Sequence, residues 1–370
     1  MRNKIQTNST RPTIIKGITP EQLKKLSKNK GVKIESQNMK IINSKGRVNI
    51  TGPKTINGVK IKENIKMTPR PDSKFLVNLA TDVKRFNLPE KGAFNPGLVK
   101  IPNSTDYVMV YRPDEYGFIG CILDENLDVK PNSYYRFNIT NCADPRIIWT
   151  PDGKLLMIYS STTKVGFNYE CIRGDIIMDL NDGVQFIDTV RQFRVSPDEL
   201  TTRQKNWMPF VHDGEIFLIA SICPHIIYKF DLNTLKAKKV CEQQWANPWF
   251  YPDDFLRGNT NPVQLEDGNY LGTFHTAVWN DKRCYYDNGC YVFSGQFPFN
   301  VLKCSNKTYL PAEGAIEPYF RNGHRIVCTF PVGMVREDNN ILIAYGDNDS
   351  VVKIMKTTVD DMLKLTLDVY

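Results

Sequence analysis

The sequence has few of the residues that form metal sites. It contains only four histidines in 370 residues, and no two of its nine cysteines form a Cys-x-x-Cys pair. Clusters of these residue types hold most protein-bound zinc, so we expect no metal and no cofactor. The odd number of cysteines also argues against a disulfide framework, and we expect reduced, mostly buried thiols.

Long apolar runs are also missing. No stretch approaches the roughly 20 apolar residues that span a bilayer, and no apolar signal segment follows Met1. We therefore expect a soluble, cytoplasmic protein, and the richness in Lys and Asn is typical of AT-rich coding genomes such as those of large DNA viruses. Hydrophobic residues still make up 41% of the chain, which is enough for a packed core.

Acidic residues are scarce at the start of the chain. Residues 1–75 contain 18 Lys and Arg but 4 Asp and Glu, a formal charge of +14, whereas the whole chain carries +8 and residues 76–370 therefore −6. We predict two parts: a basic N-terminal arm or small β-rich module over 1–75, and the main domain over 76–370. The charge of the arm suits a polyanion such as nucleic acid, or an acidic protein; a solvated tail or an arm for homo-oligomerisation is the alternative.

Local signals predict some structure inside the basic arm. Thr19 and Pro20 are suited to the start of a helix that ends at Gly31. Short alternating runs broken by turns follow over 32–66 and predict strands. Met67–Lys74, with two prolines, is predicted to be a linker.

A repeated pattern begins near Phe75. Five times a proline begins an aliphatic strand, and a polar turn leads to a second alternating strand. The prolines are Pro96, Pro145, Pro209, Pro262 and Pro331, and the turns are Pro102-Asn103, Asp152-Gly153, Asp213-Gly214, Asp267-Gly268 and Asp338-Asn339. Repeats of this length, with almost no helix, predict an all-β fold: a five-bladed β-propeller with a basic N-terminal extension. A sandwich with long insertions is the alternative.

The stretch around Asp144-Pro145-Arg146 is the strongest candidate for a site. Proline has no backbone donor and favours strand starts, so Asp144 should lie at the mouth of a strand. A carboxyl group there can act as a general acid, and Arg146 can orient an anion, although an isolated Asp-Pro-Arg is usually a turn. The innermost strands of a propeller begin near one end of its axis, so residues beside the five prolines should converge. Those residues include Asn95, Asp144, Lys205, Asn206 and Asn261.

Together these motifs resemble glycoside hydrolase family 130, the β-mannoside phosphorylases and β-mannosidases, whose fold is a five-bladed propeller. The resemblance extends over about residues 90–365. Its pieces include Asn95-Pro96-Gly97, Val110-Tyr111-Arg112, Asp144-Pro145-Arg146, Lys205-Asn206-Trp207, Phe274-His275, Thr329-Phe330-Pro331-Val332-Gly333 and Tyr345-Gly346-Asp347-Asn348-Asp349. Each piece is weak alone, but their order and spacing are fairly specific.

The resemblance implies an inverting reaction in which Asp144 donates a proton to the glycosidic oxygen. In the phosphorylases of the family, phosphate itself attacks the anomeric carbon, so no carboxylate is needed as a base. The candidates for binding phosphate or a nucleotide sugar are Arg112, Arg146, Lys205, Arg257 and His275. The candidates for binding the sugar of an oligosaccharide or glycoside are Asn95, Asn206, Tyr345 and Asp349.

Two departures from the family pattern leave alternatives open. Ala143 stands where the phosphorylases often have Glu, and Ser221–His225 occupies the place of an expected arginine. Loss of a cation weakens the case for inorganic phosphate as the nucleophile. The related propeller mannosyltransferases, which use a sugar phosphate or sugar nucleotide, offer a second interpretation. A non-catalytic glycan-binding or structural propeller is the third.

Overall fold

The chain divides into two units. They are Met1–Pro69 and Arg70–Tyr370, a boundary that lies inside the linker predicted from the sequence. The computed structural model describes residues 77–113, 117–161, 171–187, 193–198, 205–248, 256–280, 283–310, 319–321 and 324–369, together with six short strands between residues 13 and 60. The predicted helix at 19–31 and the predicted linker lie outside the described residues. No helix among the described residues is long and apolar enough to cross a membrane.

The first unit contains a four-stranded sheet and a separate hairpin. The sheet has the order β1 (Thr13–Ile15), β2 (Val32–Ser36), β3 (Met39–Ser44) and β4 (Arg47–Thr51). The hairpin joins β5 (Thr55–Ile56) to β6 (Val59–Lys60). Only β1 and β2 are parallel, and the other pairs are antiparallel.

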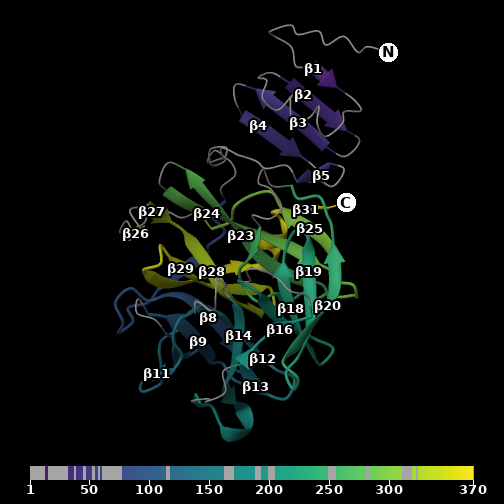
Figure 1. Cartoon of the computed structure of the whole chain (residues 1–370). Helices are drawn as coiled ribbons and strands as arrows, with labels where there is room; N and C mark the ends of the chain where they lie inside the picture. The colour runs from purple at the N-terminus through teal and green to yellow at the C-terminus, as the bar shows by residue number, and fades with distance from the viewer. Residues whose placement is uncertain are drawn as a thin grey trace. The chain divides into compact units, whose positions relative to one another are not determined.

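The second unit is a five-bladed β-propeller, which confirms the fold class predicted from the sequence (Figure 1). Blade 1 is β8 (Phe94–Lys100), β9 (Tyr107–Arg112), β10 (Ile119–Leu123) and β11 (Tyr135–Arg136). Blade 2 is β12 (Cys142–Trp149), β13 (Lys154–Ser161), β14 (Cys171–Asp179) and β15 (Phe193–Arg194). Blade 3 is β17 (Met208–His212), β18 (Glu215–Ser221), β19 (His225–Asp231) and β20 (Lys236–Gln243), with β16 (Ser196–Pro197) beside β20.

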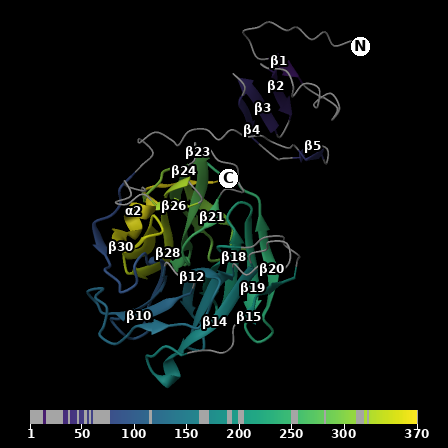
Figure 2. The same ribbon diagram turned by 60° about the vertical axis from the view of Figure 1, so that its left-hand side comes forward.

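The last two blades close the ring. Blade 4 is β21 (Arg257–Gly258), β22 (Val263–Gln264), β23 (Tyr270–Asn280), β24 (Arg283–Phe293) and β25 (Val301–Ser305), extended by β26 (Tyr319–Arg321) and β27 (His324–Val327). Blade 5 is β28 (Thr329–Glu337), β29 (Asn340–Asp347) and β30 (Val351–Thr358). Its fourth strand is β7 (Asp82–Arg85), from before blade 1. The short helix α2 (Val359–Leu363) follows β30 (Figure 2). The last strand, β31 (Thr366–Asp368), pairs with β25 of blade 4 (Figure 1).

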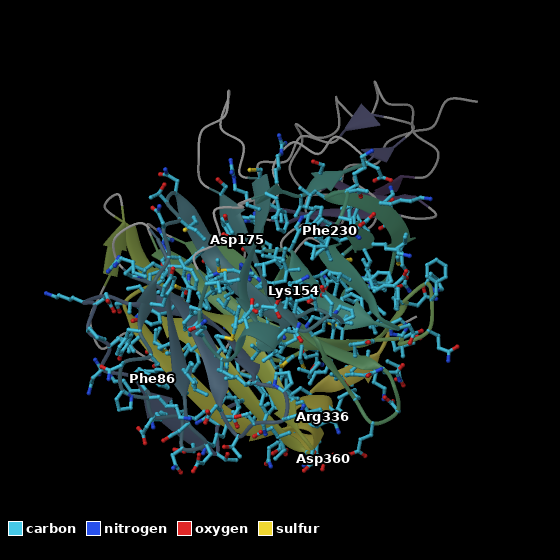
Figure 3. All side chains as sticks on the ribbon, turned by 90° about the horizontal axis from the view of Figure 1, so that it is seen from below. Phe86, Lys154, Asp175, Phe230, Arg336 and Asp360 are labelled. Carbon is cyan, nitrogen blue, oxygen red and sulfur yellow. The ribbon has the colours of Figure 1, made fainter. Side chains whose placement is uncertain are left out.

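The predicted turns each join the first strand of a blade to its second. Left-handed backbone angles mark them, as at Asn103 (φ 57°), Gly153 (φ 79°) and Gly268 (φ 82°). Glycine, Asn and Asp adopt these angles at low cost, which is why the turns were visible in the sequence. At blade 5, Asn339 of the turn donates through Nδ2 to Asp360 at 3.1 Å, and Figure 3 shows Asp360 near Arg336.

The predicted position of the prolines was wrong in one respect. Pro96 and Pro145 lie inside their strands, not at the start, because the pairing register shifts across each of them. A similar shift follows Pro331 in β28. These β-bulges tolerate proline because the extra residue makes no ladder hydrogen bond. Asp144 is therefore turned out of the sheet by a bulge in β12.

Glycines let the innermost strands approach one another closely. A β-carbon at Gly97 would overlap the carbonyl oxygen of Pro145 in the next blade. One at Gly258 would lie 2.7 Å from the carbonyl oxygen of Asn206. Such approaches need a residue without a side chain, so these positions hold the first strands of the blades at a short, fixed spacing.

Aromatic side chains fill the space between blades 3 and 4. Phe210 contacts the rings of Phe217, Phe293 and Phe299 at centroid distances of 5.4, 5.6 and 5.7 Å. His225 lies beside this cluster, fully buried, with Nδ1 3.1 Å from the carbonyl oxygen of Phe299. Its Nε2 is buried and has no hydrogen-bond partner in the part of the chain that the structure describes. Burial lowers the pKa of His225 to about 3, so the folded protein keeps it neutral.

This histidine should make the stability depend on pH. The ordinary pKa of histidine is about 6.5. Below this pH, His225 binds a proton in the unfolded chain but not in the folded chain, so stability falls as pH falls. Between pH 6.5 and pH 4, this effect of His225 should lower the free energy of unfolding by about 3 kcal/mol. We expect His225→Gln to lose less free energy of unfolding over this range than the parent chain, measured by urea denaturation at each pH. Parallel curves for the two proteins would contradict the assignment.

Candidate functional site

The candidate acid has a left-handed backbone conformation. Asp144 is half-buried and has φ 60°, and Asn95, at the equivalent bulge of blade 1, has φ 52°. Asn95 donates through Nδ2 to Oδ1 of Asp144 at 2.9 Å. Asn and Asp adopt such angles more readily than other residues with side chains. The bulge and the Asn95 amide together fix the direction of the carboxyl group.

Arg146 lies beneath the site. It is 1% exposed, and its guanidinium donates to the carbonyl oxygens of Asp144 (3.0 Å), Gly258 (3.3 Å) and Asn259 (2.5 Å). The sequence predicted that this arginine binds an anion. Because its described hydrogen bonds go to backbone carbonyls and almost none of its surface is exposed, its position suits a structural role. One guanidinium therefore joins the strand of Asp144 in blade 2 to β21 in blade 4.

His275 lies on the second strand of blade 4, directly opposite Arg257. It is 1% exposed, stacks on Tyr286 at 4.7 Å and contacts the ring of Phe330 edge-on at 4.9 Å. Its Nδ1 is 2.6 Å from Oδ1 of Asn259. Burial holds the pKa of His275 well below its ordinary value. The positive charges of Lys205, Arg257 and Arg146 lower it further.

The strand pairing places two of these cations near the ring. Arg257 and His275 are cross-strand partners, and directly opposed residues of an antiparallel pair share one face of the sheet. Arg257 is exposed, whereas His275 is buried. Lys205 is half-buried and precedes Asn206, whose backbone packs against Gly258.

Arg112 and Asp144 both act on the buried thiol of Cys142. Burial raises the pKa of this thiol to about 12, with Arg112 opposing the shift and Asp144 adding to it. Both charged groups therefore lie within electrostatic range of Cys142. The Arg112 guanidinium is 5.0 Å from the centre of the Phe94 ring, and its Nε is buried with no hydrogen-bond partner among the described residues. Such a nitrogen is suited to an anionic or hydroxylated ligand.

The four candidates for binding sugar are not equivalent. Asn95 and Asn206 are both 4% exposed, and the buried Oδ1 of each has no partner among the residues that the structure describes. The Asn95 side chain donates to Asp144, and the Asn206 backbone packs against Gly258. Tyr345 is 4% exposed within a hydrophobic cluster of blades 4 and 5. Asp349 follows β29 with φ 50°, and its Oδ1 accepts a long hydrogen bond from the Cys328 thiol at 3.9 Å.

Sequence reasoning missed several polar groups. Asn259 and Asn288 are fully buried and join His275 to blade 5, and nothing in the local pattern of either residue indicates this. Tyr159 and Arg173 face each other across β13 and β14, with the Tyr159 hydroxyl and Arg173 Nε buried and unpartnered. For Tyr159 and Arg173 the sequence did offer a signal, because an arginine is unusual within an apolar alternation such as that of β14.

Comparison with known sequences identifies the family. Residues 60–368 match the profile of glycoside hydrolase family 130, described as beta-1,4-mannooligosaccharide phosphorylase. The chain belongs to glycoside hydrolase family 130. It is a carbohydrate-active enzyme that acts on β-mannosidic linkages, as the resemblance predicted. A search of curated proteins finds no match.

Solved structures share the fold of this family 130 enzyme at low sequence identity. A β-1,2-mannobiose phosphorylase from Listeria innocua is 11% identical, with 77% of this chain and 99% of that chain covered and a TM-score of 0.53. A glycosyl hydrolase from Bacteroides ovatus is 12% identical, with 79% and 93% covered and a TM-score of 0.50. At such identities the structures support the propeller fold alone.

Removal of the Arg146 guanidinium should destabilise the propeller. Arg146→Met leaves three buried carbonyl oxygens without their donor, and we expect a loss of about 3 kcal/mol in the free energy of unfolding, measured by urea denaturation. Arg336→Met is the matched control. Arg336 also donates to three oxygens, of Asp338, Gln264 and Glu266, but its side chain is 19% exposed, and we expect a loss below about 1 kcal/mol. Equal losses in the two variants would contradict the structural role of Arg146.

Proposed function

We propose that this enzyme cleaves β-mannosides by phosphorolysis, with Asp144 as the general acid. The observation that supports it is the Arg146 guanidinium, which joins the strand of the candidate acid Asp144 to β21, where Arg257 lies. Lys205 and Arg257 both lie within electrostatic range of His275 beside that strand. Phosphate carries up to two negative charges, and several cations are needed to hold it beside a carboxylate. The family description and the Listeria enzyme, itself a phosphorylase, agree with this proposal.

The proposed reaction needs no second carboxylate. Asp144 gives its proton to the glycosidic oxygen as the bond from that oxygen to C1 breaks. A phosphate oxygen forms the new bond to C1 from the opposite face, so a β-mannoside gives α-mannose 1-phosphate with inversion. The cations hold the phosphate in line, which replaces the base that activates water in an inverting hydrolase.

Asn95 suits the role of orienting the acidic proton. Its Nδ2 donates to Oδ1 of Asp144, so Oδ1 is an acceptor. In the protonated acid the proton is then carried by the other oxygen, Oδ2. Oδ2 is therefore the atom that faces the leaving oxygen, and Asn95 acts through Asp144 and not on the sugar directly.

Release of mannose 1-phosphate tests the proposal. We expect it from short β-1,2- or β-1,4-mannosides only with phosphate present, and we expect Asp144→Asn to lower kcat by about 10³. Asp152→Asn is the control, because Asp152 lies in the turn after the same strand and pairs with Lys154 at 2.6 Å. It should keep the parent rate.

Other outcomes of this assay would point elsewhere. Mannose release without phosphate would make the enzyme a hydrolase. Product formed only from a sugar nucleotide would make it a transferase. Mannoside binding without turnover under any of these conditions would support a binding propeller.

We propose a second function for the basic first unit, the binding of a polyanion. Residues 1–75 contain 18 Lys and Arg but 4 Asp and Glu, a formal charge of +14. Positive charge concentrated in one part of the chain suits a polyanion such as nucleic acid.

Salt dependence tests this second function. We expect a labelled oligonucleotide to bind the whole chain, with log Kd rising linearly with log salt concentration. A variant with Lys33, Lys40 and Arg47 changed to Gln should bind more weakly and show a shallower slope. Lys154 and Lys229 of the propeller, changed to Gln, provide the control. Binding that is absent at low salt, or unchanged in the first variant, would refute the assignment.

A further inference from the structure

A row of polar side chains crosses blade 2 at the level of the candidate acid. The bulge that contains Asp144 lies opposite Tyr159 on β13, where the pairing register of the two strands shifts. Tyr159 is paired with Arg173 on β14, and Arg173 is paired with Arg194 on β15. Directly opposed residues of an antiparallel pair share one face of the sheet. Tyr159, Arg173 and Arg194 therefore extend outward from the acid along one face of the blade.

This face of blade 2 packs against blade 1. The ring of Tyr159 contacts the ring of Phe118 edge-on at 5.4 Å, and both belong to a hydrophobic cluster that the two blades share. Burial is the main cause of the raised pKa values of Cys142 and Tyr159, but Asp144 adds to the first shift and Cys142 to the second. The candidate acid and the Tyr159 hydroxyl therefore lie at the same end of the space between the blades.

The Tyr159 hydroxyl is a hydrogen-bond donor without an acceptor. It is buried and has no hydrogen-bond partner among the described residues. Burial, and after it the carboxylate of Asp175, raise the pKa of Tyr159 well above its ordinary value, so the phenol keeps its proton at neutral pH. A buried hydroxyl without a partner costs free energy, and such a group in a native protein is suited to a bound ligand or water.

The two arginines of the row place positive charge beside this hydroxyl. Arg173 is half-buried, and its Nε is enclosed with no hydrogen-bond partner in the described part of the chain. Arg194, directly opposite, is exposed. Like charges that face each other across a strand pair are destabilising, and a bound anion relieves the repulsion. One carboxylate, Asp175, lies two residues farther along β14 and is 1% exposed, so the row keeps a net positive charge.

We propose that this row binds an anionic group, a carboxylate or a phosphate, on the sugar that leaves with the glycosidic oxygen. The inference rests on the proposed role of Asp144 as general acid, and it names the class of substrate: β-mannosides of an acidic sugar. A guanidinium and a phenol hydroxyl can donate together to two oxygens of one carboxylate or phosphate group. A neutral sugar supplies no charge to pair with Arg173, so it should bind this row more weakly.

The position of the row favours the leaving sugar over the attacking phosphate. The row begins at the strand of Asp144 and runs outward beside blade 1, whereas Lys205 precedes blade 3 and Arg257 lies on blade 4. In an inverting reaction the acid meets the leaving oxygen, and the nucleophile attacks from the opposite face of the sugar. Neighbouring strands are about 4.8 Å apart, so Arg173 on the third strand lies about 10 Å from the first, which suits one sugar unit between the acid and the anionic group.

Synthesis from mannose 1-phosphate tests the proposal. Glucose and mannose are each compared as acceptors with their uronate and with their 6-phosphate, which differ from the parent sugar at C6 alone. We expect kcat/KM for at least one anionic acceptor to exceed that of its neutral parent by at least about tenfold, because hydrogen bonds to a charged group are the stronger ones. Equal kcat/KM for neutral and anionic acceptors in both series would overturn the inference.

Variants of the row test the assignment of residues. Arg173→Met should lower the ratio of anionic to neutral acceptor below about threefold. Tyr159→Phe keeps the ring against Phe118 and should also lower the ratio. Arg336→Met makes the same chemical change near the turn of blade 5 and should leave the ratio unaltered. A preference that survives Arg173→Met and is lost in Arg257→Met would place the anion at the other cations and overturn the inference.

Binding without turnover separates this inference from the proposed function. In Asp144→Asn, titration calorimetry with the same sugars should show the same preference for the anionic ones. That preference, in a parent enzyme whose turnover does not need phosphate, would overturn phosphorolysis and leave the acidic sugar standing. Turnover that needs phosphate, with equal affinities for neutral and anionic sugars, would overturn the inference and leave phosphorolysis standing. If none of the sugars accepts mannose, equal affinities alone overturn the inference.

Discussion

The buried guanidinium of Arg146 holds the candidate site together. A charge at 1% exposure is costly to remove from water, and here three backbone carbonyls, the charge of Asp144 and the face of Phe330, 5.8 Å away, offset that cost. The carbonyls belong to two blades that are not neighbours in the ring. The candidate acid on β12 and the candidate anion-binding residue Arg257 on β21 are thus linked by one side chain that itself has almost no exposed surface.

This arrangement also places positive charge around one buried ring. Lys205, Arg257 and Arg146 each lower the pKa of His275, so all three lie within electrostatic range of its imidazole. Burial lowers the pKa of His275 more than they do. The ring is therefore neutral near pH 7 and adds no charge of its own.

The sequence predicts those features that depend on near neighbours. Turns such as Asp152-Gly153 and Asp267-Gly268 have a local chemistry, and their spacing was enough to indicate five blades. Pro96 and Pro145 were predicted at strand starts but lie at bulges inside their strands. A proline indicates that one backbone hydrogen bond of the sheet is missing, and both a strand start and a bulge are compatible with that. The role of Arg146 was not foreseen, because its partners Gly258 and Asn259 lie 112 and 113 residues away in the chain. Tyr345 was proposed for sugar binding, but its position in a hydrophobic cluster depends on strand pairing that no local pattern encodes.

The left-handed backbone conformation of Asp144 recurs in other blades, but its carboxyl group does not. Asn95, Asp144 and Asn206 have φ of 52°, 60° and 61° on the first strands of blades 1 and 2 and just before that of blade 3. The left-handed residue therefore recurs in blades 1 to 3, and an amide is sufficient to occupy the position. An amide cannot exchange a proton near neutral pH, whereas a carboxyl group can. Among these three positions only Asp144 is therefore suited to the role of a general acid.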